Sequence, residues 1–202
     1  SDAELQVRIN DVLRAGWIKI PDEFGYRGTG APGKMLEELL DVEGGNCDEP
    51  DTGKWEIKFH SGSSLLTLFH LEGMPKGHLH PIVKKFGWLN SDGRLSFRHT
   101  VHGSVTARGF YVENDKSKII IRNKSEPNEE LAYWMHDKLI NAFAYKFRRL
   151  VLVSGQKHKG SVHYQSAVFY TEPKTTQFLT AIQNGYVAID FDVREKDLDQ
   201  YH

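Results

Sequence analysis

The 202 residues suffice for one sizeable domain, and 39% hydrophobic with 26% charged residues is an ordinary globular composition. With 26 basic and 27 acidic residues the net charge is −1, so the chain lacks the strongly basic balance of many nucleic-acid binders. No apolar run approaches the roughly 20 residues of a membrane span, and the single cysteine, Cys47, excludes an intrachain disulfide. We expect one domain over residues 1–202, in a reducing, cytoplasmic setting and without a membrane partner.

Local patterning predicts a mixture of helices and strands, since some segments repeat apolar residues at helical spacing and others alternate. In the first part of the chain we expect a helix over residues 4–15, a strand over 17–20, a glycine-rich loop over 25–33 and a helix over 34–40. Strands should follow over 54–60, 65–71, 94–105 and 109–122, the last with a break at 114–117. The remaining elements are a helix over 128–147, strands over 150–153 and 161–170, a helix over 175–183 and a strand over 186–194. This order predicts an α/β fold with a mixed β-sheet flanked by helices.

Charges are distributed unevenly along the chain. Acidic residues crowd residues 37–51, whereas basic residues gather later, at 84–85, 94–108, 146–149 and 157–159. This distribution suits a metal site flanked by phosphate-contacting surfaces, and an ordinary mixed surface is an equally open interpretation.

One short segment, Pro50 to Lys58, carries the clearest chemistry. Glu56 and Lys58 stand two apart on a predicted strand, so both project from the same face, and Asp51 precedes them after a bend at Gly53. Two carboxylates suit Mg²⁺, which can activate a water, and a neighbouring lysine can stabilise the developing negative charge. Glu-x-Lys alone is more often an exposed ion pair, but the half-buried strand and the preceding acidic helix favour a phosphodiester-cleaving site.

The segment Gly28 to Leu40, followed by Pro50-Asp51 and Trp55-Glu56-Ile57-Lys58, resembles a known family. The pattern is that of the PD-(D/E)XK nucleases and, more closely, of the MvaI/BcnI restriction endonucleases, relatives of the MutH-like repair nickases. The resemblance is close over about residues 25–72 and otherwise rests on the order of elements. It implies a restriction-endonuclease-like fold.

The resemblance also assigns roles to individual residues. It implies that Asp51 and Glu56 bind Mg²⁺, that Lys58 is the catalytic lysine, and that Glu37 is a helix-borne acid that touches the metal directly or through water. Glu38 is the rival for this last role, and the spacing of the surrounding leucines favours Glu37.

The function implied is that of a type II restriction endonuclease of a prokaryotic cell, acting on double-stranded DNA. Family members typically act as monomers that nick the two strands in turn at short C/G-rich sites, and we favour CCWGG. Two alternatives stay open: a repair nickase with the same site, and a DNA-binding module whose nuclease site is inactive. Because the chain begins with Ser1 rather than Met, we also keep open a further DNA-targeting domain.

Gly28 to Lys34 spells an apparent phosphate-binding loop, G-x-x-x-x-G-K, which needs separate consideration. Met35 follows where such a loop needs Ser or Thr to hold Mg²⁺, and no clear buried strand precedes it. We therefore favour a loop that positions the Glu37 helix over a nucleotide-binding site.

Candidate DNA contacts are side chains that match base edges or phosphates. Arginine pairs with guanine, and a carboxylate can accept from the amino group of cytosine. Each candidate is by itself more often a solvated side chain than a base contact. The predicted DNA-binding residues are His60, Arg98, Arg108, Lys157, His158, Asp192 and Arg194.

Overall fold

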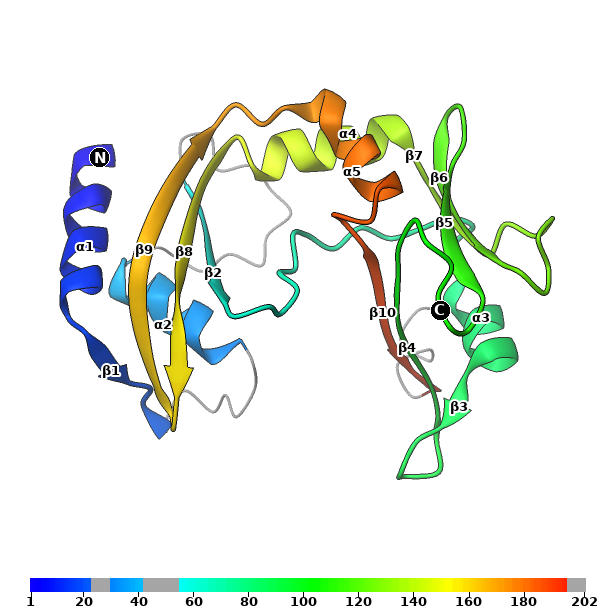
Figure 1. The fold of residues 1–202 in the computed structure, drawn as a ribbon, viewed down its shortest axis with the longest axis horizontal. Coiled ribbons are helices and arrows are strands. Elements are labelled where there is room, and N and C mark those ends of the chain that lie inside the picture. The colour runs from blue at the N-terminus through cyan, green and yellow to red at the C-terminus, as the bar shows by residue number, and fades with distance from the viewer. Residues whose placement is uncertain (23–29, 42–54, 196–202) are drawn as a thin grey trace. The chain divides into compact units, whose positions relative to one another are not determined.

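The computed structural model describes residues 1–22, 30–41 and 55–195 (Figure 1). The chain divides into two compact units: unit 1 comprises Ser1–Phe69 with Tyr145–Pro173, and unit 2 comprises His70–Ala144 with Lys174–His202. Within the described ranges, no helix is long and apolar enough to cross a bilayer.

A four-stranded mixed sheet forms the centre of unit 1. Its order is β1-β9-β8-β2, so β1 and β2 are at its two edges. β2 runs parallel to β8, and the other neighbours are antiparallel. The strands are β1 (Trp17–Lys19), β2 (Glu56–Ser61), β8 (Arg149–His158) and β9 (Ser161–Thr171), and the helices are α1 (Asp2–Arg14) and α2 (Ala31–Leu39). Ser1 caps α1 in a capping box with Glu4, which explains why the helix begins there.

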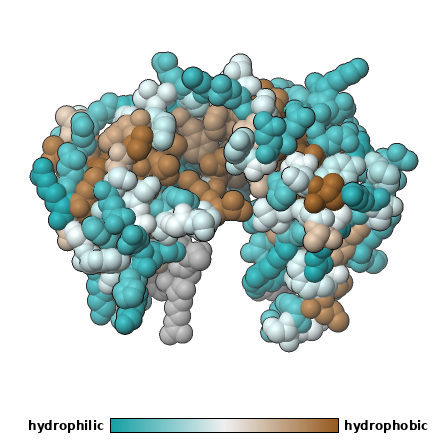
Figure 2. Space-filling model, viewed as in Figure 1, coloured by the Kyte–Doolittle hydropathy of each residue, from teal (hydrophilic) through white to brown (hydrophobic). Residues whose placement is uncertain are grey.

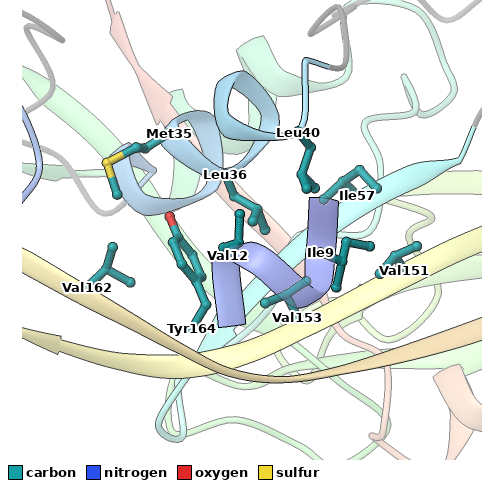
Figure 3. Packing of buried hydrophobic residues seen from close by; sticks show 10 residues of the cluster. All are labelled: Ile9, Val12, Met35, Leu36, Leu40, Ile57, Val151, Val153, Val162 and Tyr164. Carbon is teal, nitrogen blue, oxygen red and sulfur yellow. The ribbon is translucent and has the colours of Figure 1, made fainter. Parts of the chain in front are cut away.

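The core of unit 1 lies between these two helices and one face of the sheet (Figure 3). Alternation along each strand sends every second residue to this face. The Tyr164 side chain is fully buried, and its hydroxyl donates a 2.6 Å hydrogen bond to the Pro32 carbonyl, in the first turn of α2. The buried residues of the cluster are Ile9, Val12, Met35, Leu36, Leu40, Ile57, Val151, Val153, Val162 and Tyr164.

Unit 2 contains two three-stranded sheets, with orders β10-β4-β3 and β5-β6-β7. Its strands are β3 (Trp88–Leu89), β4 (Leu95–Val101), β5 (Phe110–Asn114), β6 (Lys118–Asn123), β7 (Ala132–Met135) and β10 (Ile189–Arg194). Its helices are α3 (Leu79–Phe86), α5 (Phe178–Gln183) after a 3-10 turn at Thr175–Gln177, and most of α4 (His136–Lys146), which ends in unit 1.

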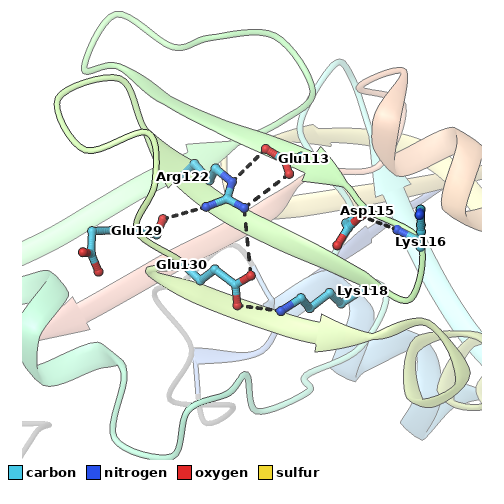
Figure 4. A network of polar contacts seen from close by, with 7 residues as sticks. All are labelled: Glu113, Asp115, Lys116, Lys118, Arg122, Glu129 and Glu130. Carbon is cyan, nitrogen blue, oxygen red and sulfur yellow. Dashed lines mark hydrogen bonds and ion pairs between the residues drawn. The ribbon is translucent and has the colours of Figure 1, made fainter.

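Aromatic rings pack the interior of unit 2, while charge pairs tie together its β5-β6-β7 sheet. The Phe97 ring lies 5.3 Å from that of Phe110 and 5.5 Å from that of Phe191, in edge-on geometries that aromatic pairs favour. On the sheet, Arg122 of β6 binds the Glu113 carboxylate of β5 through two nitrogens, at 2.7 and 3.3 Å (Figure 4). These contacts hold neighbouring strands in register.

The predicted fold class is confirmed, because helices flank sheets that include a mixed one. Two predicted elements are wrong. Residues 65–71 form no strand. Apolar residues on both faces indicated one, but none of the strands in the described part of the chain pairs with them, and Leu65 is 72% exposed. The helix predicted over 128–147 is a strand, β7, followed by the shorter α4, because residues 132–135 pair with β6 and alternate in burial.

Helix α3 was not predicted, since its surroundings are rich in glycine and proline. Pro81 is its third residue, and a proline is tolerated in the first turn, where backbone N–H groups have no partner within the helix. The side chains of Ile82 and Val83 follow and are buried, which anchors the helix.

Candidate active site

Glu56 and Lys58 both lie on β2, on the face of the sheet opposite the core residue Ile57. In the parallel pairing with β8, Glu56 aligns with Leu150 and Lys58 with Leu152, so the charged pair borders apolar neighbours. An ion pair in such surroundings is less screened by water than one on an open surface.

The same face of the sheet also carries apolar side chains on β9, the strand that pairs with β8. Val168 and Tyr170 of β9 align with Leu152 and Leu150, and they are 46% and 49% exposed. Apolar residues gather over the strands of unit 1 in Figure 2, among mainly hydrophilic ones. The candidate site therefore lies at the edge of a partly apolar surface.

Two lysines bind the Glu56 carboxylate, one at each oxygen. Lys58 Nζ lies 2.9 Å from Oε1, and Lys146 Nζ lies 3.2 Å from Oε2. The Glu56 side chain is 19% exposed, and those of Lys58 and Lys146 are 23% and 29% exposed. The carboxylate is thus held in one orientation by two partly buried ammonium groups.

Glu37 on α2 belongs to the same electrostatic cluster. Burial raises the pKa of its carboxyl above the ordinary value, Lys58 and Lys146 oppose this shift, and Glu56 adds to it. Glu37 is half-buried, whereas Glu38, its rival from the sequence, is exposed. Met35 and Leu36 anchor α2 in the core, and the neighbouring Glu37 is close enough to Glu56 and Lys58 for their charges to act on it.

Asp51, the other predicted metal ligand, lies outside the described residues. Within residues 1–22, 30–41 and 55–195, no three His, Cys, Asp or Glu side chains are grouped to hold a metal ion. The donor types nevertheless fit a hard divalent cation, because Glu56 and Glu37 both offer carboxylate oxygens, and the charge of Glu56 contributes to the raised pKa of Glu37.

The structure places the predicted DNA contacts in several locations. His60 follows Lys58 on the same face of β2 and donates from Nε2 to the Ser64 carbonyl, at 2.8 Å. Lys157 and His158 are exposed at the end of β8, where the His158 ring lies 6.2 Å from that of Trp17. Lys157, His158 and His60 belong to unit 1.

The remaining candidates belong to unit 2. Arg98 of β4 aligns with Asp192 of β10, and Arg98 Nε lies 2.6 Å from Asp192 Oδ1. Arg194 lies two residues further along β10, on the same side as Asp192 and half-buried. The Arg108 guanidinium stacks over the Trp88 ring, 3.9 Å from its centroid. The structure therefore brings Arg98, Asp192 and Arg194 together on one face of a sheet.

Two residues of these sites were missed by reasoning from the sequence. Lys146 was considered only as a phosphate contact, because nothing local connects it to Glu56. Trp17 was assigned only to a strand, yet it is 51% exposed and contacts the rings of two histidines. Its proximity to the turn between β8 and β9 comes from the pairing of β1 with β9, which no local sequence signal reports.

Comparison with solved structures defines the class. A solved structure of restriction endonuclease MvaI in complex with its cognate DNA substrate matches with a TM-score of 0.79 and 24% identity, over 98% of this chain and 94% of that one. Restriction endonuclease MvaI without DNA matches with a TM-score of 0.53 and 26% identity, over 94% of this chain and 82% of that one. The fold is that of a restriction endonuclease.

The family model of the MvaI/BcnI restriction endonucleases matches residues 7–201. The chain belongs to the MvaI/BcnI restriction endonuclease family, and the resemblance inferred from its motifs is confirmed. A search of curated protein sequences gave no match.

Proposed function

We propose that this protein is a type II restriction endonuclease that hydrolyses double-stranded DNA in a Mg²⁺-dependent reaction. The observation that carries the proposal is the Glu56 carboxylate, held between Lys58 and Lys146 beside Glu37, in a member of this family. We further propose that it acts as a monomer on a short C/G-rich site such as CCWGG, nicking the two strands in turn.

In this proposal Asp51, Glu56 and Glu37 would hold the metal. A bound Mg²⁺ would lower the pKa of a water and neutralise negative charge on the phosphate. Lys58 lies next to Glu56, where its ammonium group stabilises the charge that builds on the phosphate oxygens in the transition state. A water oxygen would bond to phosphorus and lose a proton, while the bond to the 3′-oxygen breaks and that oxygen takes up a proton, leaving a 5′-phosphate and a 3′-hydroxyl.

We propose that the face of the β4-β10 ribbon reads bases. The side chains of Arg98 and Asp192 are 48% and 63% exposed, so their ion pair contributes little to the stability of the protein. Breaking it to form contacts with a G·C pair therefore costs little free energy. We also propose that Lys157 and His158 at the end of β8, His60 and Arg108 contact the DNA.

An Arg98→Ala protein should bind its cognate site about ten- to a hundredfold more weakly, the loss expected for one base contact. Binding to unrelated DNA should change much less. Arg14→Ala is a matched control, because this exposed arginine ends α1 and pairs only weakly with Asp11, at 3.9 Å. Affinities measured at one fixed salt concentration decide the outcome, and equal losses for cognate and unrelated DNA would refute base reading.

Digestion of a sequenced plasmid containing CCWGG tests the function itself. We expect discrete double-strand breaks with Mg²⁺ and none with EDTA, and the mapped ends give the recognition site. Single-strand nicks alone would favour the repair nickase, and DNA binding without cleavage would favour a binding module. Glu56→Gln should remove the Mg²⁺-dependent breaks, because it removes the negative charge of a proposed metal ligand.

A further inference from the structure

Lys146 stands outside the motif that defines the catalytic residues, yet it contacts the centre of that motif. It is the last residue of α4, and β8 begins three positions later at Arg149. Because β8 runs parallel to β2 with Leu150 aligned to Glu56, the C-terminal end of α4 lies near the start of β2. This connection explains the 3.2 Å contact between Lys146 Nζ and Glu56 Oε2.

Both oxygens of the Glu56 carboxylate are held by ion pairs. One carboxylate receives two ammonium groups, Lys58 on Oε1 and Lys146 on Oε2, so both of its oxygens are engaged. A divalent cation that uses Glu56 must displace at least one of these contacts, and it meets the positive charge of the other at short range. Lys58 has its own proposed task at the phosphate, whereas Lys146 has none in the motif.

We propose that Lys146 is a positioning residue that holds Glu56 Oε2 in the metal-free protein and competes with a divalent cation for that oxygen. The inference rests on the proposed function, in which Glu56 is a metal ligand. Lys146 keeps the carboxylate oriented before the metal arrives, and it raises the metal concentration that the site requires. Release of its ammonium group then accompanies metal binding.

Binding of Mn²⁺ to the DNA-free protein tests this directly, because carboxylate sites accept Mn²⁺ and no cleavage occurs without DNA. Free Mn²⁺ is followed by electron paramagnetic resonance during titration. Lys146→Gln should bind Mn²⁺ about three- to tenfold more tightly than the parent, the change expected when one competing, partly buried ion pair is removed. Glu56→Gln should bind it more weakly.

Two control variants separate charge from structure. Lys146→Arg keeps the positive charge and should leave the affinity for Mn²⁺ near that of the parent. Lys138→Gln removes an exposed lysine from the same helix and should also leave it unchanged. Thermal unfolding of each variant verifies that the comparison is made between folded proteins.

The outcomes distinguish the inference from the proposed function. If Glu56→Gln weakens Mn²⁺ binding while Lys146→Gln leaves it unchanged or weakens it, Glu56 remains a metal ligand and the competition by Lys146 is refuted. If Glu56→Gln has no effect on Mn²⁺ binding, Glu56 is no ligand, and both the metal site and the role of Lys146 are overturned.

Discussion

A Lys58→Met protein is expected to fold normally and to cleave DNA about a hundred- to a thousandfold more slowly than the parent, the loss typical when one preorganised electrostatic contact is removed. Folding should be retained because the second oxygen of Glu56 keeps its contact with Lys146. Methionine also keeps most of the apolar length of the partly buried lysine side chain.

Single-turnover cleavage at saturating protein is the appropriate measurement for Lys58→Met, with the melting temperature and DNA affinity recorded beside it. Lys19→Met serves as the control, because Lys19 is exposed on β1 of the same sheet. A folded Lys58→Met protein that cleaves at the parental rate would refute the catalytic role of this lysine.

Tyr164→Ala is expected to destabilise the protein by about 3–5 kcal/mol, the usual range for truncating a fully buried aromatic side chain. The Tyr164 side chain has no exposed surface, and its ring packs edge-on against Phe59, 5.2 Å between centroids. Its hydroxyl also ties β9 to the first turn of α2 through the Pro32 carbonyl. Removal therefore leaves a cavity and also breaks the hydrogen bond between β9 and α2.

Tyr164→Phe separates these two contributions. The ring is retained and only the hydrogen bond is lost, so we expect a loss of about 0.5–1.5 kcal/mol, the usual net contribution of one hydrogen bond. Tyr170→Ala is the control on the same strand, since this side chain is 49% exposed and its removal should matter much less. The free energies of unfolding are compared by chemical denaturation, provided that their dependence on denaturant concentration is the same for all variants. Equal losses of stability for Tyr164→Ala and Tyr170→Ala would contradict the role of the buried ring.

The elements that were predicted correctly are those whose pattern is unambiguous over their own length. Helix α1 has a capping box and a regular apolar face, and β5 and β6 are separated by an evident turn. Residues 128–147 were assigned to one helix because their apolar spacing permits it. The pairing of β7 with β6 decides against this interpretation, and no local signal reports that partner.

Part of the candidate site is determined by the sequence itself. Glu56 and Lys58 share a face because residues two apart on any strand do so, and Glu37 precedes them on a recognisably amphipathic helix. The family could be inferred from these spacings, because each of them is a local feature that spans only a few residues of the sequence.

The rest of the site was decided by the tertiary structure. Lys146 reaches Glu56 only because β8 pairs in parallel with β2 and carries the end of α4 to that edge of the sheet. Arg98 meets Asp192 only because β10 returns beside β4. Such contacts join residues far apart in the chain, and their existence depends on which strands pair, a choice made by packing of the whole unit rather than by local spacing.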